Sequence, residues 1–407
     1  MNELFAQHPI LLVSLVKIVV LLFLLLTSLA YLTWFERKVA AHIQGRWGPY
    51  RVGPHGLMQP LADGLKFLFK EDTTPGSADR FVYFLAPFLS LSLAISTIAL
   101  IPFGPGTFRI FGQTTSLVVA NVNIGLLAIF AITSIGVYGV ALAGWSSNNK
   151  YSLLGGLRSA AQMVSYELSL TMSVAGVLLL VGTFNLSEIV RAQSGTTWGF
   201  LPRWNLLSPT APQLLGFFCY FVAAVAETNR LPFDLAEAES ELVAGFHTEY
   251  SSFKFAMFFM AEYASMITVS CLAAILYFGG WLSPFPQTAA FAWTRYLPAV
   301  LLACVGVGLV INGFRYSTAW GRIMLPVVGA LLCAVAILAA WPGAVDFVQG
   351  PAWFLLKILV ILFVYVWVRW TLPRFRYDQL MGIGWKFLLP VAIANVVLTS
   401  LAVVIHK

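Results

Sequence analysis

Seven of the seventeen Asp and Glu residues of the chain lie in one stretch, residues 227–262. They are Glu227, Asp234, Glu237, Glu239, Glu241, Glu249 and Glu262. Apolar segments flank the stretch on both sides, and carboxylates in such surroundings find partners or take up protons. If residues 234–242 are helical, three of the acids fall on one face, where like charges repel and their proton affinities become coupled. The pattern suits a proton reservoir or relay. The simpler alternative is a solvated acidic loop.

The composition identifies the class of protein. Of the 407 residues, 59% are hydrophobic and only 10% are charged, whereas about 25% of the residues in a soluble protein are charged. No long polar region interrupts the apolar segments. The chain is therefore predicted to be an all-α polytopic membrane protein with a single membrane domain, residues 1–407.

The apolar segments predict about ten transmembrane helices. They lie at residues 10–34, 81–102, 117–143, 160–183, 211–226, 255–279, 296–312, 323–341, 352–371 and 386–405. The first is not a secretory signal, since its positive charges, Arg37 and Lys38, follow the apolar run instead of preceding it. Glu167 is the only acid near the middle of a predicted span, which makes it a proton-transfer candidate. The alternative is a paired acid that locks two helices, with Arg158 or another subunit.

Basic residues set the predicted topology. With ten spans, the segments on the inner side hold seventeen Lys and Arg residues and the outer segments hold five. Such an excess marks the cytoplasmic side, so both termini are predicted to lie outside. Two inner segments are long, a loop at 35–80 and an acidic loop at 227–254.

The first inner loop contains a helix signal. Residues 45–56 are rich in glycine and proline, so the chain turns repeatedly there. Residues 57–70 then read as an amphipathic helix lying in the membrane interface. Its apolar stripe is Leu57, Leu61, Leu65 and Leu68.

Cysteine and histidine spacing gives no sign of a metal site. The four cysteines are scattered singly in apolar runs, without a CxxC pair, and the five histidines show no ligand spacing. This argues against an iron–sulfur cluster, a zinc site and a disulfide framework.

Three long motifs carry a family resemblance. Residues 34–72, 226–263 and 369–390, in this order, resemble the signatures of the H subunit of bacterial respiratory complex I, the proton-translocating NADH-quinone oxidoreductase. The H subunit is the counterpart of mitochondrial complex I subunit 1. The family usually has eight spans, so the two apolar runs within 285–345 are interpreted as an inserted helical hairpin.

The resemblance implies a role inside a larger enzyme. Members join the membrane arm of complex I to its peripheral arm and form much of the chamber where quinone, such as ubiquinone, is reduced. The implied partners are the quinone-module subunits of the peripheral arm, the small and antiporter-like membrane subunits, and lipid. No FMN or iron–sulfur cluster is expected on this chain, and no complete catalytic site. The implied location is the bacterial inner membrane, with both termini periplasmic.

Site residues also follow from the resemblance. Arg37 and Asp63 are expected near the narrow part of the quinone tunnel, with Arg46, Lys66 and Phe67 as weaker candidates. For Arg37 the alternative is a positive-inside anchor. A tunnel for a long isoprenoid tail must be mostly apolar, as residues 57–69 are.

The resemblance assigns the seven acids of residues 227–262 to a loop facing the quinone chamber and to the start of a chain of acids. A change in protonation is expected to pass through Glu227, Glu262 and Glu167 toward the antiporter-like subunits. Residues 45–56 and 231–236 are the candidate moving parts.

Two other functions are compatible with parts of the sequence. One is the membrane anchor of a related hydrogenase, formate hydrogenlyase or ferredoxin-dependent complex, which needs no quinone chamber. The other is a stand-alone ion transporter, which explains buried acids but not the long basic and acidic inner loops.

Overall fold

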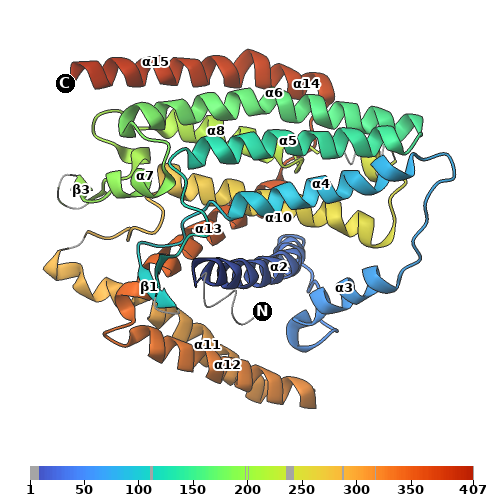
Figure 1. The fold of residues 1–407 in the computed structure, drawn as a ribbon. Coiled ribbons are helices and arrows are strands. Elements are labelled where there is room, and N and C mark those ends of the chain that lie inside the picture. The colour runs from blue at the N-terminus through green and yellow to red at the C-terminus, as the bar shows by residue number, and fades with distance from the viewer. Residues whose placement is uncertain are drawn as a thin grey trace.

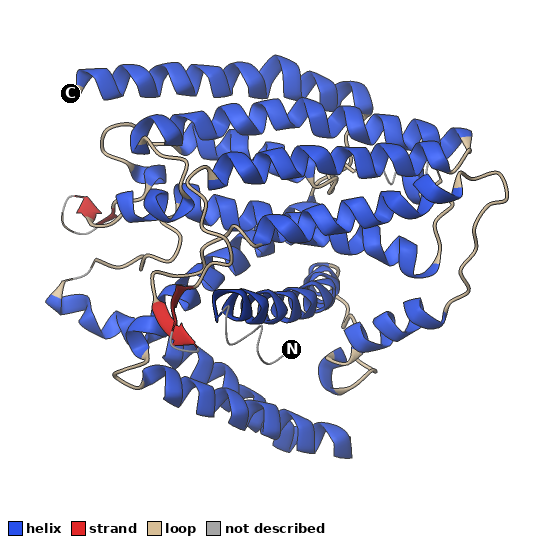
Figure 2. Cartoon of the chain, in the orientation of Figure 1, coloured by secondary structure: helices blue, strands red, loops and turns tan. Residues whose placement is uncertain are grey.

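The structure is a computed structural model that describes residues 9–110, 113–197, 199, 201–234, 243–286, 288–316 and 318–406. Helices make up nearly all of its secondary structure, and the described strands form two small antiparallel hairpins (Figures 1 and 2). The predicted all-α class is confirmed.

Nine helical segments in the described residues are long and apolar enough to cross a membrane, and α8 is apolar but has only 14 residues. In chain order the ten are α2 (Pro9–Ile43), α4 (Arg80–Ile98), α5 (Gly125–Ser146), α6 (Lys150–Val181), α8 (Leu214–Glu227), α10 (Ser252–Tyr277), α11 (Leu297–Arg315), α12 (Ala319–Ala340), α13 (Val345–Thr371) and a last segment built from α14 (Tyr377–Gly382), the π-helical turn η5 (Ile383–Leu388) and α15 (Leu389–Ile405). Each overlaps one predicted span, and α8 falls where the short span is predicted.

The remaining elements are short. They are η1 (Pro54–Gly56), α3 (Gln59–Phe69), β1 (Thr107–Ile110), β2 (Gln113–Ser116), α7 (Leu186–Ala192), β3 (Thr196–Thr197), β4 (Leu201–Pro202), η2 (Asn205–Leu207), η3 (Gly245–His247) and η4 (Ala289–Tyr296). The helix predicted at 57–70 is α3.

Several helix boundaries differ from the predicted ones, and two of the differences have a local cause. The span predicted at 117–143 begins later, as α5, because the chain after the β1–β2 hairpin first pairs with the end of α4: the Phe103 amide donates to the Leu117 carbonyl and the Ala120 amide to the Ala99 carbonyl, each at 3.1 Å. Helix α6 begins at Lys150 instead of near residue 160. Asn149 caps it by accepting a hydrogen bond from the amide of Tyr151 at 3.0 Å, which stabilises a helix start in a polar sequence.

Helix α10 is the centre of the bundle. In its most apolar stretch 72% of the residues are buried, against at most 39% in any other described span. It packs against α4, α8 and α13, and Figure 1 shows it running through the middle of the fold. Since α10 begins at Ser252, within residues 227–262, the core fixes the last part of the acidic stretch.

Helices α11 and α12 form a closely packed pair, which Figure 1 shows along the lower edge of the fold. A Cβ atom on Gly329 would lie 2.5 Å from the carbonyl oxygen of Gly306, so the two backbones touch only because both residues are glycine. Trp320 and Trp341, both exposed, flank α12, as aromatic residues do at the two surfaces of a membrane.

Lys357 closes the far end of α10. Its ammonium group, on α13, donates to the backbone carbonyls of Phe278 at 2.7 Å, Gly280 at 2.8 Å and Leu282 at 2.6 Å. Phe278 follows the last residue of α10, and Gly280 and Leu282 lie in the turn after it, so their carbonyls have no partner within the helix. The half-buried cation of Lys357 satisfies them and complements the helix dipole.

Replacing Lys357 by methionine should lower the stability of the protein by roughly 2–3 kcal/mol, because buried carbonyls lose a charged donor. The measurement is the midpoint of thermal unfolding in detergent. Lys17→Met is a graded comparison, since Lys17 also lies in a span but donates to one carbonyl, that of Val118 at 2.8 Å, so its midpoint should fall less. Equal midpoints for Lys357→Met and the unaltered protein would contradict this role.

Candidate functional site

Arg37 and Asp63 form an ion pair between α2 and α3. The guanidinium of Arg37 donates to the Asp63 carboxylate at 2.6 Å, and the side-chain amide of Gln59 donates to the other carboxylate oxygen at 2.9 Å. The side chains of Arg37 and Asp63 are 53% and 24% exposed. A pair this exposed adds at most about 1 kcal/mol to stability, and it is open to a ligand.

The three weaker quinone candidates are placed differently. Phe67 is half-buried, and its ring centre lies 6.3 Å from that of Phe255 on α10. Arg46 lies in the loop after α2, and Lys66 is exposed on α3. The structure therefore places Phe67 against the central helix, whereas Arg46 and Lys66 lie at the surface.

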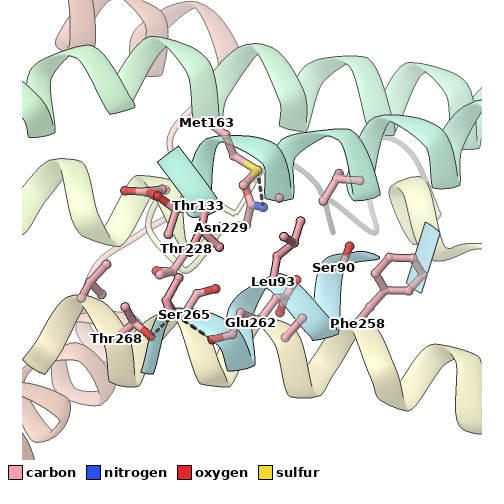
Figure 3. Close-up of a pocket in the computed structure, with 18 of the residues that line it drawn as sticks. Ser90, Leu93, Thr133, Met163, Thr228, Asn229, Phe258, Glu262, Ser265 and Thr268 are labelled. Carbon is pink, nitrogen blue, oxygen red and sulfur yellow. Dashed lines mark hydrogen bonds between the residues drawn. The ribbon is translucent and has the colours of Figure 1, made fainter. Parts of the chain in front are cut away.

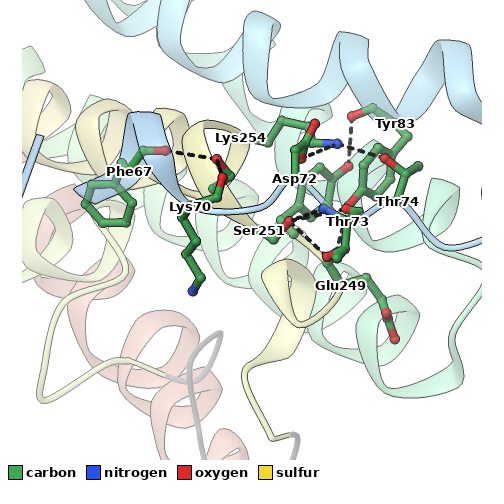
Figure 4. Close-up of polar contacts among 11 residues, drawn as sticks. Phe67, Lys70, Asp72, Thr73, Thr74, Tyr83, Glu249, Ser251 and Lys254 are labelled. Carbon is green, nitrogen blue, oxygen red and sulfur yellow. Dashed lines mark hydrogen bonds and ion pairs between the residues drawn. The ribbon is translucent and has the colours of Figure 1, made fainter. Parts of the chain in front are cut away.

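The end of α3 is fastened to the start of α10 (Figure 4). The hydroxyl of Ser252 donates to the carbonyls of Phe67 and Lys70, each at 2.9 Å. The ammonium of Lys254, nearly buried, lies 2.9 Å from the carboxylate of Asp72. These contacts fix the helix that carries Asp63 relative to the core.

The apolar stripe of α3 faces away from the chain. Leu61, Leu65 and Leu68 are all exposed, and no residue of α3 is buried. An amphipathic helix with an uncovered apolar stripe is suited to contact lipid or a hydrophobic ligand or partner.

Glu36, the residue before Arg37, is buried, with its side chain 6% exposed. Its carboxylate pairs with the guanidinium of Arg369 near the end of α13 and lies 3.7 Å from that of Arg230. The hydroxyl of Tyr263, on α10, donates to it at 2.8 Å. Two neighbouring residues of α2 thus belong to two different charge groups.

Arg230 extends this second group toward α10. Its guanidinium lies 3.9 Å from the carboxylate of Glu262 and 4.2 Å from the centre of the Tyr263 ring. The group, here named the buried charge cluster, consists of Glu36, Arg230, Glu262, Tyr263 and Arg369. It holds two carboxylates and two guanidinium groups, which balance. Removing one partner from such a group costs about 3–5 kcal/mol, because a buried charge loses its counterion.

A cavity of about 70 Å³ adjoins the cluster (Figure 3). Glu262 and Ser265 of α10 line it together with Ser90 of α4, Thr133 of α5 and Glu227 of α8. A space of this size holds roughly five water molecules, and the polar side chains in its mostly apolar wall can bind them. Glu262 and Glu227 therefore border one small space inside the helix bundle.

Glu227 needs a partner that the described residues do not supply. Its Oε2 atom is buried and accepts no hydrogen bond from any of them. A buried carboxylate oxygen requires a donor or a proton, so Oε2 is suited to carry a proton. A second carboxyl group, that of Glu167 on α6, lies nearby, and two charged carboxylates there would repel each other.

Glu167 joins two helices. Its carboxylate accepts a hydrogen bond from the hydroxyl of Ser134 on α5. Arg158, the intrachain partner considered from the sequence, lies with its guanidinium 5.7 Å from the centre of the Tyr377 ring. The Ser134 bond locks α5 to α6 and leaves the charge interaction with Glu227 in place.

Asp234 ties the acidic stretch to the last of the three sequence motifs. Its buried carboxylate lies 3.3 Å from the guanidinium of Arg374. Beside it, the amide of Phe375 donates to the carbonyl of Pro232 at 3.1 Å, and the Phe375 ring stacks on that of Phe233. Residues 231–234 are therefore held against residues 374–375.

The next three acids, Glu237, Glu239 and Glu241, lie outside the described residues, and their shared helical face stays a prediction. Glu249 is described, and its carboxylate accepts a hydrogen bond from the Asn149 side chain at 2.6 Å. This bond attaches the end of the acidic stretch to the cap of α6.

His247 adds no positive charge to the acidic stretch. It is buried, and its ring centre lies 4.8 Å from that of Phe246 and 5.3 Å from that of Phe255. Burial lowers the pKa of His247 to about 4, so the imidazole is neutral at pH 7.

The sequence interpretation missed four members of the buried charge cluster. It counted Arg230 and Arg369 as marks of the inner side and gave no role to Glu36 or Tyr263. Glu36 carried a signal, because an acid at the cytoplasmic end of a span is not explained by the positive-inside rule. Its partners come from segments almost two hundred residues or more away, and a single sequence does not pair them.

Within the part of the chain that the structure describes, no group of three or more His, Cys, Asp or Glu residues is placed to hold a metal ion. Cys219 and Cys271 are buried, Cys304 is exposed, and the cysteines are free thiols.

Comparison with known proteins gives consistent matches. A family model described as NADH dehydrogenase matches residues 16–400. The chain is 50% identical over 391 residues to the NADH-quinone oxidoreductase H subunit 1 of Solibacter usitatus, with 96% of each chain covered. It is 50% identical over 403 residues to the corresponding H subunit 2 of Koribacter versatilis, with 97% of each chain covered. It is 46% identical over 385 residues to the H subunit of Thermomicrobium roseum, covering 94% of this chain and 93% of the relative.

Proposed function

The chain belongs to the family of NADH-quinone oxidoreductase H subunits, and from this premise we propose that it forms part of the quinone chamber and the start of the proton path of the enzyme. It is a multi-pass membrane subunit of that oxidoreductase complex. Electrons for quinone reduction come from partner subunits, and the chain supplies binding, positioning and proton movement.

The observation that carries the proposal is the opposite placement of two neighbours on α2. Arg37 points to Asp63 at an exposed ion pair, and Glu36 points into the buried charge cluster. One helix therefore connects a surface suited to a ligand with an internal chain of titratable groups. A change in charge at the exposed first site acts on the adjacent residue Glu36, whose buried surroundings screen charges less than water does.

The first site suits a quinone. The carbonyl oxygens of a quinone accept hydrogen bonds, which the guanidinium of Arg37 can donate. The isoprenoid tail of the quinone needs an apolar surface. The exposed stripe of α3 and the ring of Phe67 provide that surface next to the ion pair. Arg46 and Lys66 are proposed to act farther from the head group, as cations at the mouth of the tunnel.

The second site suits proton movement. Quinone reduction consumes two protons and changes the local field, which disturbs the balance of two carboxylates and two guanidinium groups in the cluster. Glu262 belongs to the cluster and also lines the cavity, and Glu227 lines the same cavity. Water there is proposed to link the two carboxyl groups, and the carboxyl group of Glu167 on α6 is proposed as the next member of the path.

The acidic loop is proposed to face the quinone chamber. Asp234 and Glu249 are held at its two ends by Arg374 and Asn149. Between them, Glu237, Glu239 and Glu241 are proposed to share protons with the chamber.

The basic residues support one orientation in the membrane. The loop that carries Arg37 and the acidic loop belong to the inner segments, where Lys and Arg residues are concentrated. We propose that this side is cytoplasmic and binds the peripheral arm, with both termini periplasmic and the membrane a bacterial inner membrane.

Replacing Arg37 by glutamine should raise the KM for quinone about tenfold, because one charged hydrogen bond to the ligand is lost. The measurement is NADH-to-quinone activity against quinone concentration in membranes of the native host, with assembly checked on a native gel. Arg80→Gln is the control, since Arg80 is an exposed cation at the start of α4. If both variants leave the KM unchanged, Arg37 is an anchor and the quinone assignment is wrong.

A further inference from the structure

We infer that Tyr316, at the tip of the α11–α12 pair, is a positioning residue that holds the loop of residues 45–56 on the end of α2 and so sets the geometry of the Arg37–Asp63 pair. The inference rests on the proposed quinone function. It gives the α11–α12 pair a task in the access of quinone to the first site, beyond filling space in the membrane.

Tyr316 bridges distant parts of the chain. Its side chain is buried, at 8% exposure. Its hydroxyl oxygen accepts a hydrogen bond from the backbone amide of His55 at 3.0 Å. Its ring meets the His55 ring edge-on, with centres 5.1 Å apart, and the Tyr50 ring at 6.2 Å. One side chain from the α11–α12 tip thus contacts both halves of the glycine-rich and proline-rich loop.

The start of α12 holds Tyr316 in place. The guanidinium of Arg322 donates to the Tyr316 carbonyl at 2.8 Å. A Cβ atom on Gly321 would lie 2.1 Å from the Tyr316 ring, so the ring packs directly on the backbone of α12. The ring and the hydroxyl are therefore presented to the loop from a fixed support.

The loop itself needs such a support. His55 has a φ of 53°, a left-handed conformation that costs a residue other than glycine about 1 kcal/mol or more. The amide of His55 is the one that donates a hydrogen bond to the Tyr316 hydroxyl. On the other side, the indole of Trp34 donates to the His55 carbonyl at 3.3 Å, and the ammonium of Lys38 donates to the Trp47 carbonyl at 3.3 Å. The loop is thus held between α2 and α12.

The loop leads directly to the quinone pair. Three residues after His55, the amide of Met58 donates to the Val52 carbonyl at 3.2 Å and closes the loop. Helix α3 begins at the next residue, Gln59, whose side chain donates to Asp63. A shift of the loop therefore moves the start of α3 relative to Arg37 on α2, and with it the ion pair on which the proposed head-group site depends.

Two variants test the inference in the assembled complex. Tyr316→Phe keeps the ring and removes the hydroxyl acceptor. Gly321→Ala keeps the tyrosine and displaces its ring. Both should raise the KM for a long-chain quinone about fivefold, the factor for one hydrogen bond of ordinary strength, with turnover at saturating quinone unchanged. Tyr296→Phe, at the other end of α11, is the control, because its hydroxyl accepts from the neighbouring exposed Arg295 and not from the loop.

Hydrogen–deuterium exchange supplies a readout that does not depend on quinone. Amide exchange in a peptide covering residues 47–58 should rise in both variants and stay at the wild-type level in Tyr296→Phe. Unchanged exchange in an assembled Tyr316→Phe complex would overturn the inference. Faster exchange with an unchanged KM would overturn it as well, because the loop would then be held for another purpose. Failure of the quinone assignment itself is seen separately, as an unchanged KM in Arg37→Gln.

Discussion

Replacing Glu227 by glutamine should lower quinone reduction and proton pumping together, by at least about tenfold, in a complex that still assembles. Glutamine has nearly the same shape but cannot exchange a proton. The oxygen that changes is Oε2, which is buried and has no hydrogen-bond partner among the described residues. Since Glu227 lines the cavity shared with Glu262, its loss interrupts the proposed path between the cluster and Glu167.

The matched control for this prediction is Glu188→Gln. Glu188 lies exposed on α7, where its carboxylate accepts a hydrogen bond from Thr183 at 2.7 Å, and the proposed path does not use it. The measurement is NADH oxidation by quinone and formation of a pH gradient in the same membrane vesicles. Wild-type rates of both in Glu227→Gln would exclude this residue from the path.

The second large effect is expected for Glu36→Gln. Arg369 then loses the charged carboxylate that it pairs with, and of its two carboxylate partners Arg230 keeps that of Glu262. Breaking a buried ion pair in this way costs about 3–5 kcal/mol. We expect less assembled complex on native gels. In the fraction that assembles, turnover should be at least about tenfold lower, a factor that corresponds to about 1.4 kcal/mol.

Tyr263→Phe gives a graded comparison for the same cluster. It removes one hydrogen bond to Glu36 and keeps every charge, so turnover should fall by roughly fivefold. If Tyr263→Phe is as inactive as Glu36→Gln, the charge balance of the cluster is not what matters. Normal turnover in an assembled Glu36→Gln complex would remove the cluster from the mechanism.

Much of the fold follows from hydrophobic pattern and charge. The length of the apolar segments identified the nine helices that, in the described residues, are long enough to cross a membrane, because a bilayer sets how long such a segment must be; the tenth predicted span is the shorter apolar helix α8. The stripe of leucines identified α3, because apolar residues at this spacing lie on one face of a helix. The boundaries were less predictable. Helix α6 begins at Lys150, after the cap Asn149, ten residues before the predicted start. A hydrophobic pattern does not indicate a cap of this kind.

The family resemblance named Arg37 and Asp63, which lie 26 positions apart within one motif, and the structure pairs them. Their role in binding quinone stays a prediction. The buried charge cluster draws on α2, α10, α13 and the residue Arg230, so it exists only after the helices pack. Glu36 and Arg369 are 333 positions apart, and in one sequence each resembles an ordinary charge at the edge of a membrane span.

The side-by-side kinetics of Arg37→Gln and Glu36→Gln test the central claim most directly, because the account assigns these neighbours to two different sites. Quinone is titrated in proteoliposomes while the pH gradient is recorded. The account predicts a higher KM with near-normal turnover and pumping for Arg37→Gln. For Glu36→Gln it predicts lower turnover and pumping at saturating quinone, with the KM changed by less than about twofold. The same change of KM and turnover in both variants would contradict the claim that one helix separates quinone binding from proton movement.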